Sequence, residues 1–176
     1  MKYIVMALKS EAQALVERYK LHKSKLRDYT LFENEKIRLI ISGVGVENAM
    51  RATQTLIDFY DISDEDIYIN LGICAASKEY EIGALIEVGT ILYQEEEFIV
   101  HSYLQSKIHC MDAEQTDATS ELVDMESFGF YDAVRHSSAI KNFHIYKVVS
   151  DHFEPQSVTK DGTKKLIGDV LEQLEL

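Results

Sequence analysis

The chain has 176 residues, a length that suits one domain with a single core, and we expect residues 1–176 to form one folding unit. Hydrophobic residues make up 46% of the chain and charged residues 27%, a balance typical of a globular protein and not of a disordered one. Thirty acidic residues against 18 basic ones give a formal charge of −12, which repels phosphate backbones and anionic membranes. We therefore expect neither nucleic acid nor a membrane as a partner.

The cellular compartment is suggested by two further features. The apolar run at residues 1–7 is too short, and is followed too soon by charge, to act as a signal peptide, and no apolar run reaches the length of a transmembrane helix. Cys74 and Cys110 stand apart, without the paired spacing of a zinc or redox motif. These features predict a cytoplasmic protein with two buried, reduced thiols and no metal site.

Strand and helix patterns alternate along the first half of the chain. Residues 2–7 are almost all apolar, as in a strand that is buried on both faces, and Ser10 and Glu11 then suit the start of a helix. The predicted elements are a strand (2–7), a helix (10–19), a hairpin of two strands around Asn34-Glu35 (26–33 and 36–42), a helix (46–60) and a strand (67–71).

The second half continues the alternation after a group of short strands. The predicted elements are strands (84–93, 97–104 and 107–112), a polar irregular segment (113–120), a strand (122–124), a helix (127–134), a strand (143–149) and a terminal helix (157–174). The whole pattern predicts an α/β fold with three αβα layers around a central mixed, mostly parallel β-sheet.

Two acids and one glycine turn are placed where such a sheet binds ligands. Glu126 and Asp151 each follow a short apolar run, and ligands of open α/β sheets bind beyond the carboxyl ends of the strands. An ordinary helix-start or turn role remains an alternative for each acid. Residues 42–45 (Ser-Gly-Val-Gly) connect a strand to a helix, which favours an anion or polar ligand at the helix start. The turn lacks the third glycine of the dinucleotide-binding fingerprint.

Six short segments, taken in order, resemble the nucleoside phosphorylase superfamily, and most closely its hydrolytic branch, the methylthioadenosine/S-adenosylhomocysteine nucleosidases. The segments are residues 7–12 (ALKSEA), 42–45 (SGVG), 70–72 (NLG), 88–92 (VGTIL), 123–126 (VDME) and 149–151 (VSD). The resemblance covers nearly the whole chain and implies the same three-layer fold.

The resemblance also implies a role for each matching residue. Glu126 would hold the ribose hydroxyls, with Met125 packed against the sugar. Asp151 would protonate N7 of a purine, with Ser150 beside it, and Glu11 would activate the attacking water. In the motifs at residues 42–45 and 70–72, the small residues Ser42, Gly43 and Gly72 are expected to approach the substrate.

The chemistry of N-glycosidic cleavage agrees with these roles. The transition state builds positive charge on the sugar and negative charge on the departing base, so a carboxylate near the sugar and an acid near the base both lower the barrier. These groups and water suffice for the reaction, so no metal or organic cofactor is implied. The expected partner is a small-molecule nucleoside, and the resemblance implies a homo-oligomer, a dimer in the first instance.

The sequence departs from the family around the base pocket. The segment before Glu121 is short, and residues 112–114 (Asp-Ala-Glu) place a charge where the family carries an aromatic ring that stacks on the base. Phe153 and Phe98 are candidates for the missing ring. The departure leaves the identity of the nucleoside open.

Three functions therefore remain as hypotheses. The first is a purine nucleosidase, which Glu11 favours. The second is a phosphate-dependent phosphorylase that uses Arg51, which lies in the helix after the glycine turn. The third is a homologue that binds a nucleoside without cleaving it. A flavodoxin-like signalling domain is a weaker alternative, because the acidic cluster after the first strand is missing.

Overall fold

The structure is a computed structural model that describes residues 1–116, 120–174 and 176. Its strands are β1 (Lys2–Met6), β2 (His22–Leu26), β3 (Tyr29–Glu33), β4 (Ile37–Ile41), β5 (Ile67–Ala76), β6 (Leu85–Glu87), β7 (Thr90–Tyr93), β8 (Glu96–Ile99), β9 (Lys107–Cys110), β10 (Leu122–Asp124) and β11 (Asn142–Asp151). Its helices are α1 (Lys9–Tyr19), α2 (Val46–Phe59), α3 (Ser127–Arg135), the short 3-10 helix η1 (Pro155–Ser157) and α4 (Lys160–Val170). The predicted irregular segment 113–120 falls partly on residues 117–119, which lie outside the described residues.

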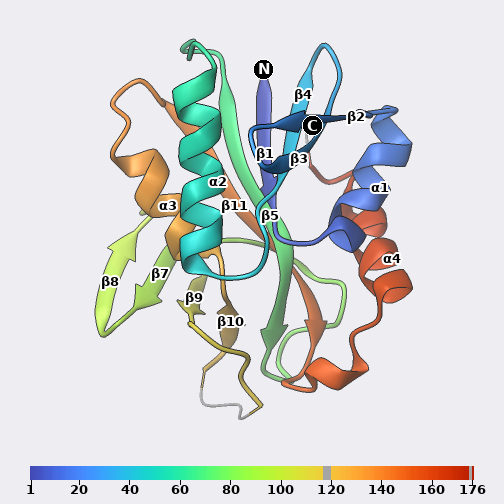
Figure 1. Ribbon diagram of the computed structural model, residues 1–176. Helices are drawn as coiled ribbons and strands as arrows, with labels where there is room; N and C mark the ends of the chain where they lie inside the picture. Colours follow the sequence, from blue (N-terminus) through green and yellow to red (C-terminus); the bar gives the residue numbers. More distant parts are fainter. Residues whose placement is uncertain (117–119, 175) are drawn as a thin grey trace.

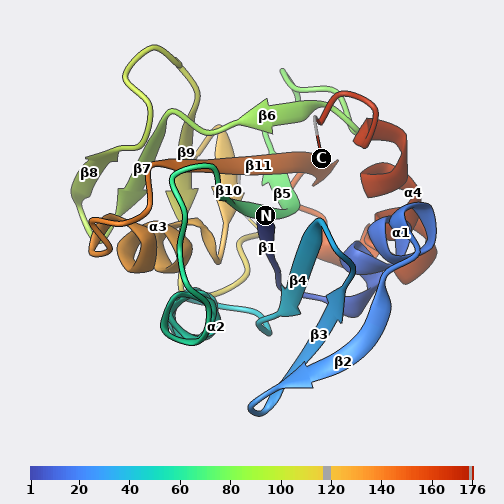
Figure 2. The same cartoon turned by 90° about the horizontal axis from the view of Figure 1, so that it is seen from above.

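The described strands form one mixed sheet that is twisted and bent (Figure 2). Its order is β2-β3-β4-β1-β5-β10-β9-β7-β8, and β11 pairs with both β5 and β6. The pairs β4–β1, β1–β5 and β5–β11 are parallel, so four strands in the middle of the sheet end at the same edge. Antiparallel pairing makes up half of the ten pairings and includes both ends of the sheet. The predicted mixed sheet is confirmed, with its parallel order concentrated around β1 and β5.

Helices cover both faces of this sheet, which confirms the three-layer architecture. Figure 1 shows α2 and α3 on one face and α1 and α4 on the other. The alternating side chains of β1 explain why both faces need a cover: Tyr3 and Val5 belong to the core under α2 and α3, while Ile4 and Met6 belong to the core under α1 and α4. The apolar run read from the sequence is therefore a strand buried on both sides.

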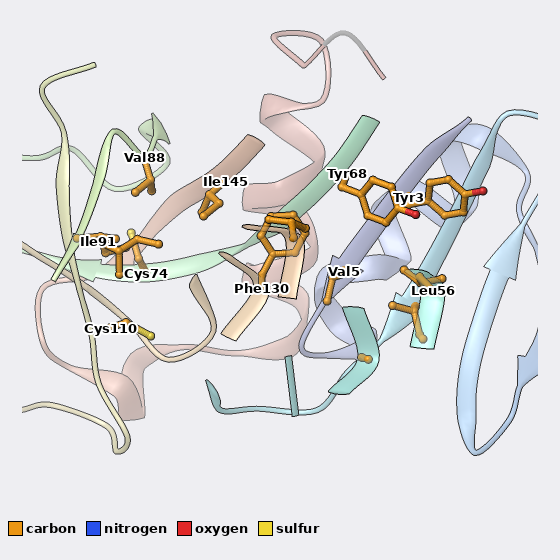
Figure 3. Packing of buried hydrophobic residues seen from close by; sticks show 14 of the residues in the cluster. Tyr3, Val5, Leu56, Tyr68, Cys74, Val88, Ile91, Cys110, Phe130 and Ile145 are labelled. Carbon is orange, nitrogen blue, oxygen red and sulfur yellow. The ribbon is translucent and has the colours of Figure 1, made fainter. Parts of the chain in front are cut away.

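The core on the α2 side is drawn in Figure 3. The rings of Tyr3 and Tyr68 stack with their centroids 4.7 Å apart, and Phe130 brings α3 into the same cluster. A β-carbon at Gly129 would lie 1.9 Å from the carbonyl oxygen of Val46, so α2 and α3 approach as closely as they do only because α3 carries glycine at this point.

Three predicted elements differ from the structure. The predicted strand 26–33 is two strands, because the turn residue Arg27 has a positive φ of 51°, and β2 is a polar edge strand without an apolar pattern. The predicted strand 84–93 divides at Gly89, where a β-carbon would meet the carbonyl oxygen of Leu104 at 2.5 Å. The predicted strand 97–104 ends at Ile99, since the following residues turn back to Gly89.

The terminal helix also begins later than predicted. Pro155 starts η1, and α4 then begins anew after Thr159, whose hydroxyl accepts a hydrogen bond of 3.1 Å from the amide of Gly162. The apolar side of α4 packs on α1. Within the residues that the structure describes, no helix combines the length and the apolar character that crossing a membrane requires.

Candidate active site

A cavity of about 310 Å³ lies at the edge where the parallel strands end. Its walls come from the residues after β1, the carboxyl ends of β5 and β11, the β10–α3 connection and residues 113–115. This position confirms that Glu126 and Asp151 face one crevice, since both line it. A second hollow of about 680 Å³ lies between α1 and α4, but it is lined largely by exposed charged side chains that pair with one another, such as Lys164 with Glu17.

Glu11 is held at the cavity by the backbone on both sides of its carboxylate. One oxygen accepts a hydrogen bond of 2.8 Å from the amide of Leu8 at the start of α1, and the other accepts one of 3.0 Å from the amide of Ile73 on β5. The side chain is only 2% exposed, and burial raises the pKa of Glu11, with these backbone hydrogen bonds opposing the rise. Glu11 is therefore a buried acid fixed between a helix and a strand, and not a solvated residue of a first helical turn.

Gly72 makes room for this acid. A β-carbon at Gly72 would lie 3.0 Å from a carboxylate oxygen of Glu11 and 3.5 Å from the ammonium nitrogen of Lys147. The neighbouring carboxylate has little freedom to move, because two backbone amides hold it. The small residue predicted in this motif thus lies directly behind the candidate catalytic side chain.

Glu126 receives a hydrogen bond from the predicted glycine turn. The amide of Gly45, whose φ is +107°, donates to a carboxylate oxygen of Glu126 at 3.0 Å. The anion in front of this turn is therefore a side chain of the protein itself. Burial raises the pKa of Glu126 to about 7; Asp124 and Glu11 add to the rise, while Lys147 and the Gly45 amide oppose it.

The charged centre of the site includes two residues that the motif reading left without a role, Lys147 and Asp124. The ammonium nitrogen of Lys147 is completely buried and lies 2.7 Å from Asp124 and 3.9 Å from Glu126. The contact with Asp124 is a close pairing of charges more than a well-aligned hydrogen bond. These carboxylates, with Glu11, raise the pKa of Lys147 against the effect of burial and so favour the charged form of the lysine.

Asp124 also organises the turn that carries Glu126. Its carboxylate accepts hydrogen bonds from the amides of Glu126 at 3.2 Å and Ser127 at 2.8 Å, and from the Ser127 hydroxyl at 2.6 Å. One signal in the sequence does point to this pair: Lys147 stands within an apolar strand, and a buried lysine requires a carboxylate partner.

Asp151 ends β11 on the other side of the cavity. One of its oxygens accepts a hydrogen bond of 2.8 Å from the amide of Glu154, and the other lies 2.7 Å from the hydroxyl of Ser150. The same hydroxyl lies 3.1 Å from the carbonyl oxygen of Cys74. Since a hydroxyl has one proton, Ser150 either donates a hydrogen bond to Asp151, or donates to the Cys74 carbonyl and accepts a hydrogen bond from a protonated Asp151. The arrangement therefore satisfies both the charged and the neutral form of Asp151.

One part of the cavity lining comes from the segment in which the expected aromatic ring is missing. Ala113, Glu114 and Gln115 line the cavity there, so the predicted replacement of the ring by a charge places Glu114 at the cavity. Neither candidate ring is among the lining residues: Phe153 is buried in the turn after Asp151, and Phe98 packs against aromatic residues of α3.

The structure thus gathers five of the eight predicted site residues around one cavity. These are Glu11, Met125, Glu126, Ser150 and Asp151. Ser42, Gly43 and Gly72 lie behind the lining: Gly43 forms the turn with a φ of +86°, and the hydroxyl of the buried Ser42 donates to backbone carbonyls of Met6 and Gly43. Cys74 lines the cavity, and burial raises the pKa of both Cys74 and Cys110, which confirms that the two cysteines are buried.

The fold defined by this sheet and its helices is that of the nucleoside phosphorylase and nucleosidase proteins. No family model matches the sequence, and no curated protein matches it. Among solved structures, the methylthioadenosine/S-adenosylhomocysteine nucleosidase of Neisseria meningitidis superposes with a TM-score of 0.76 at 14% identity, covering 98% of this chain and 99% of that one. A putative nucleosidase of the same kind from Francisella philomiragia gives 0.79 at 11% identity over 97% and 96% of the two chains. Futalosine hydrolase of Helicobacter pylori gives 0.76 at 11% identity over 98% of each chain.

Proposed function

We propose that the protein is a purine nucleosidase that hydrolyses the N-glycosidic bond of a nucleoside such as methylthioadenosine or S-adenosylhomocysteine. The observation that carries this proposal is the convergence of three buried acids, Glu11, Glu126 and Asp151, on one cavity at the carboxyl ends of the strands. The fold shared with nucleosidases supports it.

In the proposed reaction, the bond between C1′ of the ribose and N9 of the purine breaks, and its electrons pass to the base. Asp151 donates a proton to N7, which makes the base a better leaving group. Glu126 accepts hydrogen bonds from the ribose hydroxyls and stabilises the positive charge on the sugar. Glu11 takes a proton from the water that attacks C1′. The products are the sugar, with the hydroxyl from water on C1′, and the neutral base.

Phosphorolysis is the less favoured alternative on two observations. Arg51, the residue considered for binding phosphate, lies exposed on α2 and pairs with Glu47. No Arg or Lys is among the described residues that line the cavity, whereas four carboxylate side chains besides Asp124 line it. A phosphate dianion would therefore meet repulsion where it must attack. Water carries no charge and avoids this repulsion.

The rim of the cavity suggests where the 5′ end of the nucleoside lies. Leu8 and Val44 line the cavity and are 41% and 43% exposed. An apolar 5′ substituent such as a methylthio group would cover them. The homo-oligomer implied by the family resemblance, a dimer, remains part of this proposal, and light scattering of the purified protein measures it.

Release of the base from methylthioadenosine, adenosine and inosine, with and without phosphate, tests the proposal. We expect release that needs no phosphate and that falls about a hundredfold to ten-thousandfold in Asp151→Asn, because a general acid contributes that much. Asp28→Asn, in the exposed β2–β3 turn, is the matched control and should keep full activity. Strict dependence on phosphate would identify a phosphorylase. Nucleoside binding without release of base would identify the non-catalytic homologue.

A further inference from the structure

A second group of ligand-type side chains lies at the other end of β11. Glu87 at the end of β6, His101 in the loop after β8 and His144 near the start of β11 each offer one ligand atom, and these atoms all lie within 4.8 Å of one another. His144 and Asp151 are seven residues apart on an extended strand, which separates this group from the cavity by roughly 20 Å. The group therefore belongs to no part of the site described above.

Strand register puts two of the three side chains on one face. Glu87 stands opposite Tyr146 in the antiparallel β6–β11 pair, and His144 lies two residues before Tyr146, on the same side of β11. The imidazole of His144 stacks on the ring of Tyr146, with centroids 5.5 Å apart at an angle of 14°. Its Nδ1 lies 2.8 Å from a carboxylate oxygen of Glu87. The pair is thus fixed both by the sheet and by the ring beneath it.

The loop that carries His101 is attached to the same corner of the sheet. The amides of Val100 and His101 both donate to the carbonyl oxygen of Gly89, at 2.9 and 3.0 Å. The hydroxyl of Ser106 at the end of the loop donates to the carbonyl oxygen of Glu87 and accepts from the amide of Gly89. Because Gly89 has no side chain, Leu104 lies directly against it. The backbone is therefore arranged before any ligand binds.

The hydrogen bond of His101 leaves its imidazole ready to bind a cation. Its Nε2 lies 3.0 Å from the carbonyl oxygen of Phe143, and since a carbonyl only accepts, Nε2 carries the proton of the neutral ring. The other ring nitrogen then has its lone pair free. A histidine that donates one N–H to a backbone carbonyl while the second nitrogen binds a metal is the usual arrangement of metal-ligating histidines.

We propose that Glu87, His101 and His144 form a zinc-binding site that joins β6, β11 and the loop of residues 100–106. Two imidazoles and one carboxylate are ligands that Zn²⁺ prefers over Mg²⁺ or Ca²⁺, and three protein ligands leave a fourth position for water. Ligand atoms around a tetrahedral zinc lie roughly 3.4 Å apart, so small side-chain rotations complete the site. All three residues are partly exposed, which gives the ion and its water access. Their wide spacing in the sequence matches no local zinc motif.

Titration of the chelator-treated full chain with Zn²⁺ alone, followed by calorimetry, tests the site. We expect one zinc per chain and a melting temperature that rises with zinc concentration. Replacing either ligand, in His101→Gln or His144→Gln, should weaken binding at least tenfold. His22→Gln, a substitution of an exposed histidine on β2, is the matched control and should bind as the unaltered chain does. Equal affinity in the double variant H101Q/H144Q would overturn the proposal, as would the absence of saturable binding to the unaltered chain.

A spectroscopic measurement on the unaltered chain does not depend on how the variants fold. Co²⁺ in a low-coordinate site with imidazole ligands gives intense visible absorption, whereas an octahedral surface ion absorbs weakly. We expect the intense bands at one equivalent of Co²⁺ and their loss when Zn²⁺ is added. Weak bands that grow without saturation would contradict the proposed site. Neither result depends on nucleoside hydrolysis, so the outcome is independent of the function proposed for the cavity.

Discussion

Replacement of Lys147 by methionine is the substitution that most directly tests how the candidate active site is held together. Lys147 is completely buried and is the cation of a cluster that contains Asp124, Glu126 and Glu11. Methionine has a similar length and an apolar end, so it fills the same space without the charge. The variant then leaves buried carboxylates without the cation that compensates them.

The magnitude follows from the two distances. With an effective dielectric constant of about 20, the 2.7 Å contact with Asp124 corresponds to a gross attraction of about 6 kcal/mol, and the 3.9 Å contact with Glu126 to about 4 kcal/mol. Desolvation of the ions costs several kcal/mol each and offsets much of this attraction. Removing one partner of a buried pair typically costs 3–5 kcal/mol. We therefore expect K147M to lower the free energy of unfolding by about 3–5 kcal/mol at pH 8.

Unfolding in urea at pH 5 and pH 8, followed by circular dichroism, measures the loss. Lys147 lowers the pKa of Glu126, so its removal raises that pKa further, and the folded variant binds more protons than the folded wild type. The loss of stability should therefore be smaller at pH 5 than at pH 8. Lys107→Met is the matched control, because Lys107 lies 2.9 Å from Glu97 but both are about half exposed, and such pairs contribute no more than about 1 kcal/mol. A loss below 1 kcal/mol in K147M at pH 8, or a loss equal at both pH values, would refute this reasoning.

Three further substitutions test the surroundings of the site. The folded-state pKa of Glu126, about 7, lies above its unfolded value, so this residue should lower the free energy of unfolding by on the order of 3 kcal/mol as the pH rises from about 4.5 to 7. Glu126→Gln should remove that fall, which urea titrations at several pH values measure. A fall of the same size in the variant would contradict the raised pKa of Glu126. Gly72→Ala should lower the rate of base release at least tenfold with a loss of about 1–3 kcal/mol in stability, because its β-carbon would press on the carboxylate of Glu11 at 3.0 Å, and an unchanged rate would show that this acid can move freely. Gly129→Ala should lower the free energy of unfolding in urea by at least about 3 kcal/mol, because a β-carbon 1.9 Å from a main-chain oxygen of α2 forces the helices apart. Gly168→Ala is the matched control: its β-carbon would have its nearest neighbour at 3.6 Å, so the free energy of unfolding should stay the same or rise.

Local sequence patterns predicted the centre of the fold well, because a strand that is buried on both faces is recognisable as an apolar run. The strand predicted at residues 2–7 is apolar at almost every position and proves to be buried on both faces. The edge of the sheet was predicted less well. β2 has the sequence His-Lys-Ser-Lys-Leu, which is polar because the strand lies at an edge of the sheet. The strand is held by its pairing with β3, and this pairing leaves no apolar pattern in the sequence of β2.

The candidate site shows the same limit at the level of single residues. Asp151 could be placed from sequence, because it ends a strand that is parallel to β5 at the edge where ligands bind. Glu126 lines the same cavity although β10, the strand before it, runs antiparallel to β5. The partner of Lys147 could not be placed, since Asp124 lies 23 positions earlier and only the pairing of β5 with both β10 (antiparallel) and β11 (parallel) brings the two together. The sequence does state that a lysine in an apolar strand needs a partner. It does not state which carboxylate supplies the contact.

The balance of charge at the cavity explains why the proposed chemistry suits this arrangement. One buried cation, Lys147, stands among three buried carboxylates, Asp124, Glu126 and Glu11. Burial raises the pKa values of Glu126 and Glu11, and Lys147 only partly offsets the rise. In the proposed reaction the ribose becomes positively charged as the base departs. That charge arises beside carboxylates that lack a full complement of cations, so the site interacts more strongly with the transition state than with the neutral nucleoside, which is the condition for accelerating the reaction. A second buried lysine or arginine would relieve the shortage in the resting protein and would remove part of this difference.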